Sequence, residues 1–198
     1  MATSNDSSPA VPSRTRVLVA GIGNIFFRDD GFGPAVATAM LSSTEPLPDG
    51  VRVVDYGIRG LHLAYDVLDG VDALVLVDSV PGDPAPRDAV PRDAARAQGD
   101  PGSITVLEVG QDDLGQAEFD AHGMQPVSVL ASLGSMGGEL PPTYVVGCVP
   151  ADVSEGMGLS DPVASAVDEG VSLVSELLKR LVDGPLGVAP AAVRGSGG

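Results

Sequence analysis

Apolar runs of strand length alternate with segments of helical periodicity along most of the chain. The runs at residues 16–21, 51–56 and 72–80 are rich in β-branched residues and predict strands. The segments 31–43 and 61–70 between them have the spacing of amphipathic helices. Continuous apolar runs are typical of strands covered on both faces. The order strand, helix, strand, helix, strand therefore predicts a doubly wound parallel sheet between two layers of helices.

The second half of the chain continues this pattern after an interruption. Residues 81–101 are rich in Pro, Asp, Ala and Arg without a sustained apolar period, which predicts a loop insertion. Beyond it we expect strands at 103–109 and 143–150 and a helix at 125–133. A last helix begins at Ser160, whose hydroxyl is suited to cap it, and one apolar face of this helix is expected in the core. That face comprises Val163, Val167, Val171, Val174, Leu178 and Leu181.

A length of 198 residues suits one domain with a full core. We therefore predict a single α/β domain over residues 15–183. Its fold is expected to be a three-layer αβα sandwich around a twisted, mostly parallel sheet of about five strands, of the phosphorylase/hydrolase-like kind. The composition of residues 1–14 and 184–198 predicts disordered tails.

The composition disfavours several classes of partner and site. A formal net charge of -16 makes nucleic acid a poor partner. No apolar run reaches the length of a membrane span, and the N-terminus lacks the apolar core of a secretory signal, so we expect a cytoplasmic protein without membrane insertion. The single cysteine, Cys148, excludes an internal disulfide. Because it lies in an apolar strand, packing is favoured over thiol chemistry.

Acidic residues gather where the predicted strands end. Asp29 and Asp30 follow the first strand, Asp55 ends the second, and Asp78 ends the third. Since ligands of an open α/β sheet bind at the carboxyl ends of its parallel strands, these acids are candidate site residues. Asp29 and Asp30 could instead cap the helix that follows them. Asp78 is harder to explain structurally, because an unpaired charge at a buried position is costly.

His122 precedes a predicted helix and adds an imidazole to this set. Alone, such a histidine is more often a surface residue than a ligand. Together, Asp30, Asp78 and His122 would supply two carboxylates and one imidazole at one edge of the sheet. That donor set suits a first-row divalent metal better than magnesium or calcium, which prefer oxygen ligands. His62, with Asp66 four residues later, is interpreted as half of a solvated pair.

The Gly-x-Gly turn after the first strand raises a second interpretation, a dinucleotide site. Gly21 and Gly23 match the first two glycines of that fingerprint, but Phe26 occupies the place of the third. Asp55 lies 32 residues after Gly23, whereas the ribose-binding acid is expected about 20 residues on. Acids beside the turn would also repel a pyrophosphate. No nucleotide cofactor is therefore expected.

These motifs resemble those of the NiFe hydrogenase maturation proteases, endopeptidases that trim the C-terminal tail of the hydrogenase large subunit. The resemblance rests on GIGNIFFRDDGFG (21–33), DYGIRG (55–60), LVLVDSV (74–80), AHG (121–123), VVGCVP (145–150) and GLSDPV (158–163). They occur in the family's order and span roughly Val17 to Leu181. The chain departs from many members at 56–58, where those have Gly-Gly-Thr, and in the length of the 81–101 segment.

The resemblance implies an endopeptidase that removes the C-terminal extension of a hydrogenase large-subunit precursor after nickel insertion. Asp30, Asp78 and His122 would then be the catalytic residues and would engage nickel presented by that precursor. Roles in substrate positioning fall to Gly23, Asn24, Asp29, Asp55, Gly57 and Gly60. Two carboxylates and a metal permit either a metal-activated water or a carboxylate base. The alternatives are a dinucleotide-dependent oxidoreductase and a non-catalytic α/β module that binds a metal or a partner.

Overall fold

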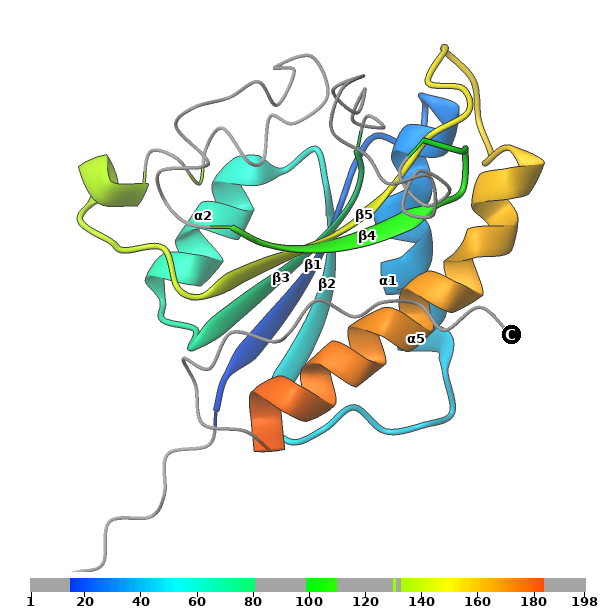
Figure 1. Cartoon of the computed structure of the whole chain (residues 1–198). Coiled ribbons are helices and arrows are strands. Elements are labelled where there is room, and N and C mark those ends of the chain that lie inside the picture. The colour runs from blue at the N-terminus through cyan, green and yellow to red at the C-terminus, as the bar shows by residue number, and fades with distance from the viewer. Residues whose placement is uncertain (1–14, 81–98, 110–129, 131–132, 184–198) are drawn as a thin grey trace, which may run out of the picture.

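One sheet organises the chain, of which the computed structural model describes residues 15–80, 99–109, 130 and 133–183. Within these residues five strands lie in the order β2-β1-β3-β5-β4 (Figure 1). They are β1 (Val17–Ile22), β2 (Val51–Gly57), β3 (Ala73–Ser79), β4 (Ile104–Val109) and β5 (Thr143–Cys148). Only the pairing of β4 with β5 is antiparallel among these strands. The predicted α/β fold with a mostly parallel sheet is confirmed.

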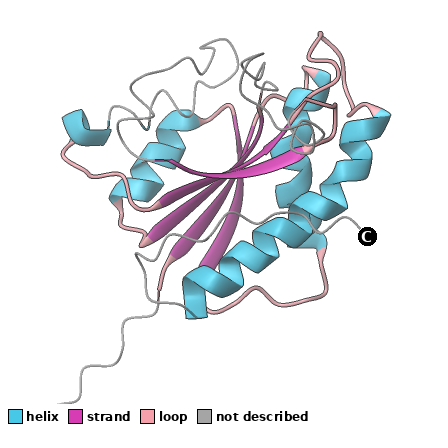
Figure 2. Cartoon of the chain, in the orientation of Figure 1, coloured by secondary structure: helices cyan, strands magenta, loops and turns pink. Residues whose placement is uncertain are grey.

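Helices cover both faces of this sheet (Figure 2). The helices α1 (Phe32–Ser42) and α5 (Asp161–Asp183) pack on one face, and α2 (Gly60–Leu68) packs on the other. Two short 3-10 turns, η1 (Arg28–Gly31) and η2 (Leu133–Met136), complete the described elements. The three layers are those that the alternation of strands and helices predicted.

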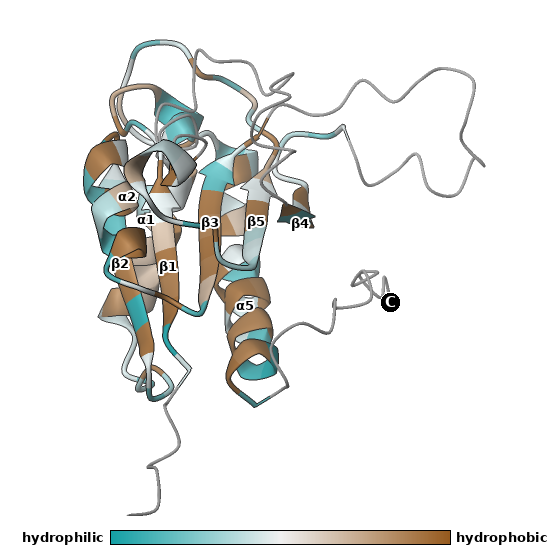
Figure 3. Ribbon diagram, turned by 90° about the vertical axis from the view of Figure 1, so that its left-hand side faces the viewer, coloured by the Kyte–Doolittle hydropathy of each residue, from teal (hydrophilic) through white to brown (hydrophobic). Residues whose placement is uncertain are grey.

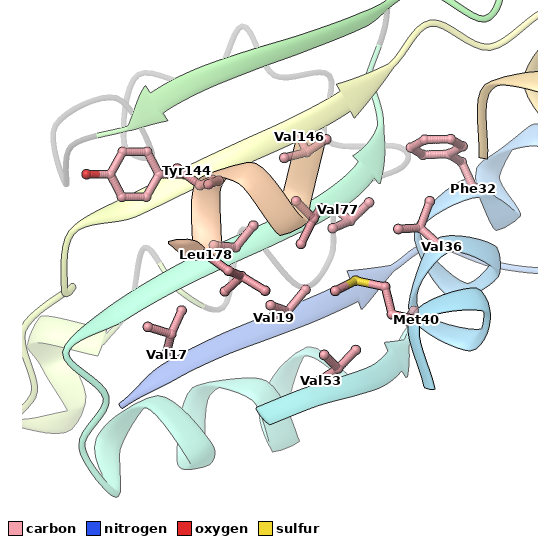
Figure 4. Packing of buried hydrophobic residues seen from close by; sticks show 14 of the residues in the cluster. Val17, Val19, Phe32, Val36, Met40, Val53, Val77, Tyr144, Val146 and Leu178 are labelled. Atoms are coloured by element: carbon pink, nitrogen blue, oxygen red, sulfur yellow. The ribbon is translucent and has the colours of Figure 1, made fainter. Parts of the chain in front are cut away.

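Two hydrophobic clusters join the layers. The first contains Val19 of β1, Phe32 of α1 and Leu178 of α5 (Figure 4). In the second, Leu18 of β1 packs with Leu63 of α2. Neighbouring residues of a strand face opposite sides of the sheet, so each side of β1 meets its own layer of helices. This is why its sequence is apolar throughout and does not alternate.

The predicted elements agree with the described ones within two residues at each end. The apolar stripe of α5 lies in or against the first cluster, as expected. The helix predicted at 125–133 lies largely outside the described residues, although Leu130 and Leu133 are buried. The tails and residues 81–98 also lie outside them. None of the helices in the described part of the chain is long and apolar enough to cross a membrane.

The order of the strands reverses between β1 and β3. From β1 the chain passes through α1 to β2 on one side, whereas β3 and β5 lie on the other side of β1. Because the connections leave toward opposite faces, the carboxyl ends of β1 and β3 flank the crevice where open α/β sheets bind ligands. The residues that follow β1 and end β3 are therefore the first place to look for a site.

Candidate active site

Asp30 and Asp78 meet at this crevice through Ser79. The hydroxyl of Ser79 donates to Oδ1 of Asp30 at 3.1 Å, and the backbone N–H of Ser79 donates to Oδ1 of Asp78 at 2.8 Å. In Figure 3, β3 is apolar along most of its length and turns hydrophilic at this end. The two acids that the sequence places at the ends of different strands are thus held by one residue.

Asp78 is almost fully buried, with 1% of its surface exposed. Its Oδ2 atom is buried and has no hydrogen-bond partner in the described structure. Burial raises the pKa of Asp78 well above its ordinary value, and the negative charge of Asp30 raises it further. The shift favours the protonated carboxyl group, and the unpartnered Oδ2 atom is a candidate ligand for a cation.

Asp30 is half-buried and is oriented by the turn that follows β1. Its Oδ2 atom accepts a hydrogen bond from the backbone N–H of Asn24 at 2.7 Å. Gly23 has a φ of +130°, and a Cβ atom built there would overlap the carbonyl oxygen of Asp30. Glycine is therefore required at this position both by its conformation and by the close approach of Asp30. Two predicted positioning residues, Gly23 and Asn24, act directly on Asp30.

Asp29 has a different environment from its neighbour. It is fully buried, and its carboxylate accepts hydrogen bonds from the N–H groups of Ala151 (2.8 Å), Asp152 (2.9 Å) and Ser160 (2.6 Å) and from the Ser160 hydroxyl (2.8 Å). Burial alone would raise the pKa of Asp29, but the hydrogen bonds from Ser160, Asp152 and Ala151 outweigh it and lower the pKa. Both oxygens of this carboxylate accept hydrogen bonds from the protein itself, so any contribution of Asp29 to substrate positioning is indirect.

The structure does not support the alternative interpretation, in which these acids cap the following helix. The N-cap residue of α1 is Gly31, with no side-chain cap hydrogen bond. Asp29 instead binds Ser160 beside the start of α5, a helix far away in the sequence. The Ser160 hydroxyl, predicted to cap α5, donates to Asp29. This contact joins the two ends of the site, the turn after β1 and the loop after β5.

Arg28 adds a second link between these segments. It is the one non-glycine residue with positive φ, +46°, in the described part of the chain. Its backbone N–H donates to the carbonyl oxygen of Gly156 at 3.0 Å. Its Nε atom lies 3.1 Å from Oδ2 of Asp152, an ion pair outside hydrogen-bonding geometry. A strained backbone that is fixed by its surroundings is typical of functional sites, and here it immediately precedes Asp29 and Asp30.

The other predicted positioning residues lie on the β2 side of the same edge. The carbonyl oxygen of Gly57 accepts a hydrogen bond from the N–H of Gly23 at 3.2 Å, so the loops after β1 and β2 lie together. Asp55 is half-buried near the end of β2, opposite Gly21 of β1. Gly60 is buried at the first position of α2. These residues border the site without a described contact to the Asp30 and Asp78 carboxylates.

His122 lies outside the described residues, so the three-residue metal set stays a prediction. Within the described ranges, no group of three or more His, Cys, Asp or Glu side chains could hold a metal ion. His62 also differs from its interpretation, because Asp66 pairs with Arg52 at 3.2 Å and accepts a hydrogen bond from the Tyr56 hydroxyl.

Cys148 is a packing residue, as predicted. It is fully buried in the first hydrophobic cluster. Burial, with smaller contributions from the charges of Asp29 and Glu169, raises the pKa of its thiol to about 12. A thiol with such a pKa is a poor nucleophile at neutral pH.

Ser79 was not among the residues predicted from the sequence. The only sequence feature that could have indicated it is its position in LVLVDSV, where a polar residue directly follows Asp78 at the end of an apolar strand. A hydroxyl at that position can serve either the strand end or a neighbouring loop. Only the packing of η1 against β3 shows that it serves Asp30.

Comparison with known proteins assigns a family to this arrangement. Residues 92–177 match a family model described as hydrogenase maturation protease. A solved hydrogenase 2 maturation peptidase from a Thaumarchaeota archaeon is 30% identical, over 83% of this chain and 98% of that one, with a TM-score of 0.58. The hydrogenase 2 maturation protease of Escherichia coli is 26% identical, over 83% of this chain and 91% of that protein.

The fold agrees with the same proteins. The solved hydrogenase maturating endopeptidase of Escherichia coli superposes with a TM-score of 0.65 at 23% identity, over 84% of this chain and 93% of that one. The family match and the solved peptidase that is 30% identical indicate that the chain is a peptidase. The chain belongs to the hydrogenase maturation protease family, which confirms the resemblance seen in its motifs.

Proposed function

We propose that this peptidase removes the C-terminal extension of a NiFe hydrogenase large-subunit precursor after nickel has been inserted. The observation that carries the proposal is the junction of Asp30 and Asp78 at Ser79, in which one buried Asp78 oxygen has no partner. A buried carboxyl group beside a second acid is stabilised by a proton or by a nearby cation. Nickel held by the precursor supplies that cation, so the metal belongs to the substrate.

Asp30, Asp78 and His122 engage the nickel in this proposal. As the cation approaches, its charge offsets both the burial of Asp78 and the repulsion from Asp30, and Asp78 gives up its proton. A precursor without nickel leaves Asp78 in its protonated form and does not draw the two side chains onto one centre. This difference is how the enzyme distinguishes a loaded precursor from an empty one.

The loops after β1 and β2 position the precursor beside these acids. Gly23 and Asn24 hold Asp30, and the hydrogen bond between Gly23 and Gly57 fixes one loop against the other. Asp55 and Gly60 border the same edge. Hydrolysis of the peptide bond then uses either a water activated by the metal or a carboxylate that acts as general base.

The test is to incubate the protein with nickel-loaded and nickel-free precursor and to follow the mass of the precursor over time. We expect the loss of a C-terminal peptide only from the loaded form, and no loss with Asp30→Asn. Equal cleavage of both forms would overturn the role of nickel. A stable complex with an intact loaded precursor would instead indicate a non-catalytic binding module.

A further inference from the structure

The turn that orients Asp30 and the loop after β5 that is bound to it carry exposed apolar side chains, which the proposed chemistry does not use. Phe26 and Phe27 lie in the turn between β1 and η1, and Val153 and Met157 lie in the loop after β5. Each is between 42% and 70% exposed. These four residues are termed the apolar lip. The chain has four phenylalanines in all, and two of them lie on this surface. Neighbouring exposed apolar side chains mark sites of interaction.

The two halves of the lip form one unit. The N–H of Gly156 donates to the carbonyl oxygen of Phe26 at 2.8 Å, and Phe27 and Gly156 form a parallel bridge. Asp29 and Arg28 bind the same loop after β5 through their side chains. Figure 1 shows this loop beside the start of α1. The lip is thus held in place by hydrogen bonds on both sides and does not depend on its own packing.

The lip is also fixed relative to the carboxylate of Asp30. The backbone N–H of Asp30 donates to the carbonyl oxygen of Phe27 at 3.1 Å. At the other end of the turn, the N–H of Asn24 donates to the Asp30 side chain. Phe26 and Phe27 therefore lie within the same tight turn that orients the acid.

The charges around the lip decide which partner fits it. Arg28, which lies beside the lip, is paired with Asp152. Asp30 makes the adjoining centre negative, and the chain carries a net charge of -16. The surface is therefore apolar with an anionic centre at its border. Its complement is an apolar surface with a cation at its border, and an acidic partner surface is disfavoured.

We propose that the apolar lip docks the polypeptide of the precursor that surrounds its nickel. The docking segment carries apolar side chains and no excess of negative charge. The inference rests on the proposed function, because that function supplies the cation. Binding free energy then comes chiefly from the lip, where aromatic side chains are effective anchors, and the chemistry comes from the carboxylates.

The experiment compares tail removal from nickel-loaded precursor by lip variants and by matched controls. The lip variants are Phe26→Ser with Phe27→Ser, and separately Met157→Ser. The controls are Leu41→Ser on α1 and Leu107→Ser on β4, whose side chains are 55% and 44% exposed away from the lip. We expect the double lip variant to raise KM about tenfold or more with kcat within twofold, since it loses docking and keeps the carboxylates. The controls should change neither constant.

Binding is measured separately, so that failure of the inference differs from failure of the proposed function. Asp30→Asn protein, with and without the lip substitutions, is titrated with loaded precursor, and thermal unfolding confirms that each variant is folded. Wild-type protein that binds but never cleaves would overturn the proposed function and leave the lip testable by Kd. An unchanged KM and Kd in the lip variants would overturn the inference. So would a dimer that dissociates on lip substitution while KM stays constant, because a second copy would then occupy the lip.

Discussion

Asp29 and Asp30 are adjacent in the chain, yet their carboxylates bind opposite sides of the site. Asp29 is buried and accepts four hydrogen bonds from residues 151–160. Asp30 accepts one from Asn24 and one from Ser79, beside Asp78. A pair that looks like one acidic motif is therefore a structural anchor followed by a site residue. Substitution of each to the isosteric amide separates the two roles.

We expect Asp29→Asn to lower the free energy of unfolding at pH 7 by roughly 2–4 kcal/mol, because the amide loses charge-assisted hydrogen bonds and brings N–H groups against other donors. Urea unfolding measures this difference. The pKa of Asp29 is lowered on folding, so its contribution is present above the ordinary value near 3.9 and is lost as pH falls through the folded pKa. The gap between wild type and variant should therefore close in acid. Equal stabilities at pH 7 would contradict the anchoring role.

Asp30→Asn should leave the free energy of unfolding within about 1 kcal/mol of wild type, since Asp30 is half-buried and the amide oxygen can still accept a hydrogen bond. Cleavage of loaded precursor should fall by about 100-fold or more, because the group that engages the cation or accepts a proton is gone. Parallel measurements of unfolding and of tail removal test both halves. Retained cleavage would remove Asp30 from the site.

Asp78→Asn should stabilise the protein at neutral pH, by about 1–3 kcal/mol, while it abolishes cleavage. The wild-type acid is buried with one unpartnered oxygen and a pKa raised well above the ordinary value. Such a group binds more protons in the folded state than in the unfolded one, so its stabilisation is full below about pH 3.9 and declines as pH rises. Between pH 4 and 8, the free energy of unfolding should decrease more steeply with rising pH for the wild type than for the variant. A less stable variant at pH 7 would show that the carboxylate is paired.

Ser79→Ala tests whether the hydroxyl positions Asp30. It removes one hydrogen bond and keeps the backbone N–H that binds Asp78. If loss of this hydrogen bond raises the activation free energy by about 1 kcal/mol, kcat falls five- to tenfold and KM is unchanged. Ser79→Thr keeps the hydroxyl and should restore kcat. Stability measured on both variants serves as the control, and an equal loss of kcat in Ser79→Thr would exclude the positioning role.

The fold was predictable because each strand carries its own signal. Largely apolar runs such as 16–21 and 72–80 indicate strands that are covered by helices on both faces. A sheet covered on both faces has three layers. The stripe on α5 likewise identifies its buried face. These are local patterns that need no knowledge of distant contacts.

The candidate site was predictable only in part. The position of Asp78 at the end of a buried strand indicated that its side chain is buried and that a charge on it is unfavourable, and the structure confirms both. The anchoring of Asp29 was not predictable, because its partner Ser160 is 131 residues away and no short-range pattern connects them. Ser79 was missed for the same reason, since its partner Asp30 lies on another element. His122 stays a prediction, as does its place beside the two acids.

Gly23 offers a test of how closely the turn after β1 must approach Asp30. Gly23 and Gly137 both have positive φ, +130° and +85°, but a Cβ atom on Gly137 would meet nothing within 4 Å, whereas one on Gly23 would overlap the Asp30 carbonyl oxygen. Gly137→Ala should therefore cost only about 1–2 kcal/mol of backbone strain. Gly23→Ala adds a steric clash to that strain and should cost about 3 kcal/mol or more.

Gly23→Ala should also impair cleavage under conditions where the variant is folded, because relief of the clash moves the backbone of Asp30 and breaks the hydrogen bond from Asn24. Thermal unfolding of the two alanine variants separates strain from clash, and tail removal well below both melting temperatures measures the effect on Asp30. If Gly23→Ala matched Gly137→Ala in both stability and cleavage, the close approach of Gly23 would not be what positions Asp30. If instead stability fell while cleavage per folded molecule held, the turn would support the fold without orienting the acid. We expect both to fall, because the carbonyl group that blocks a side chain at Gly23 belongs to Asp30, which engages the precursor in the proposed function.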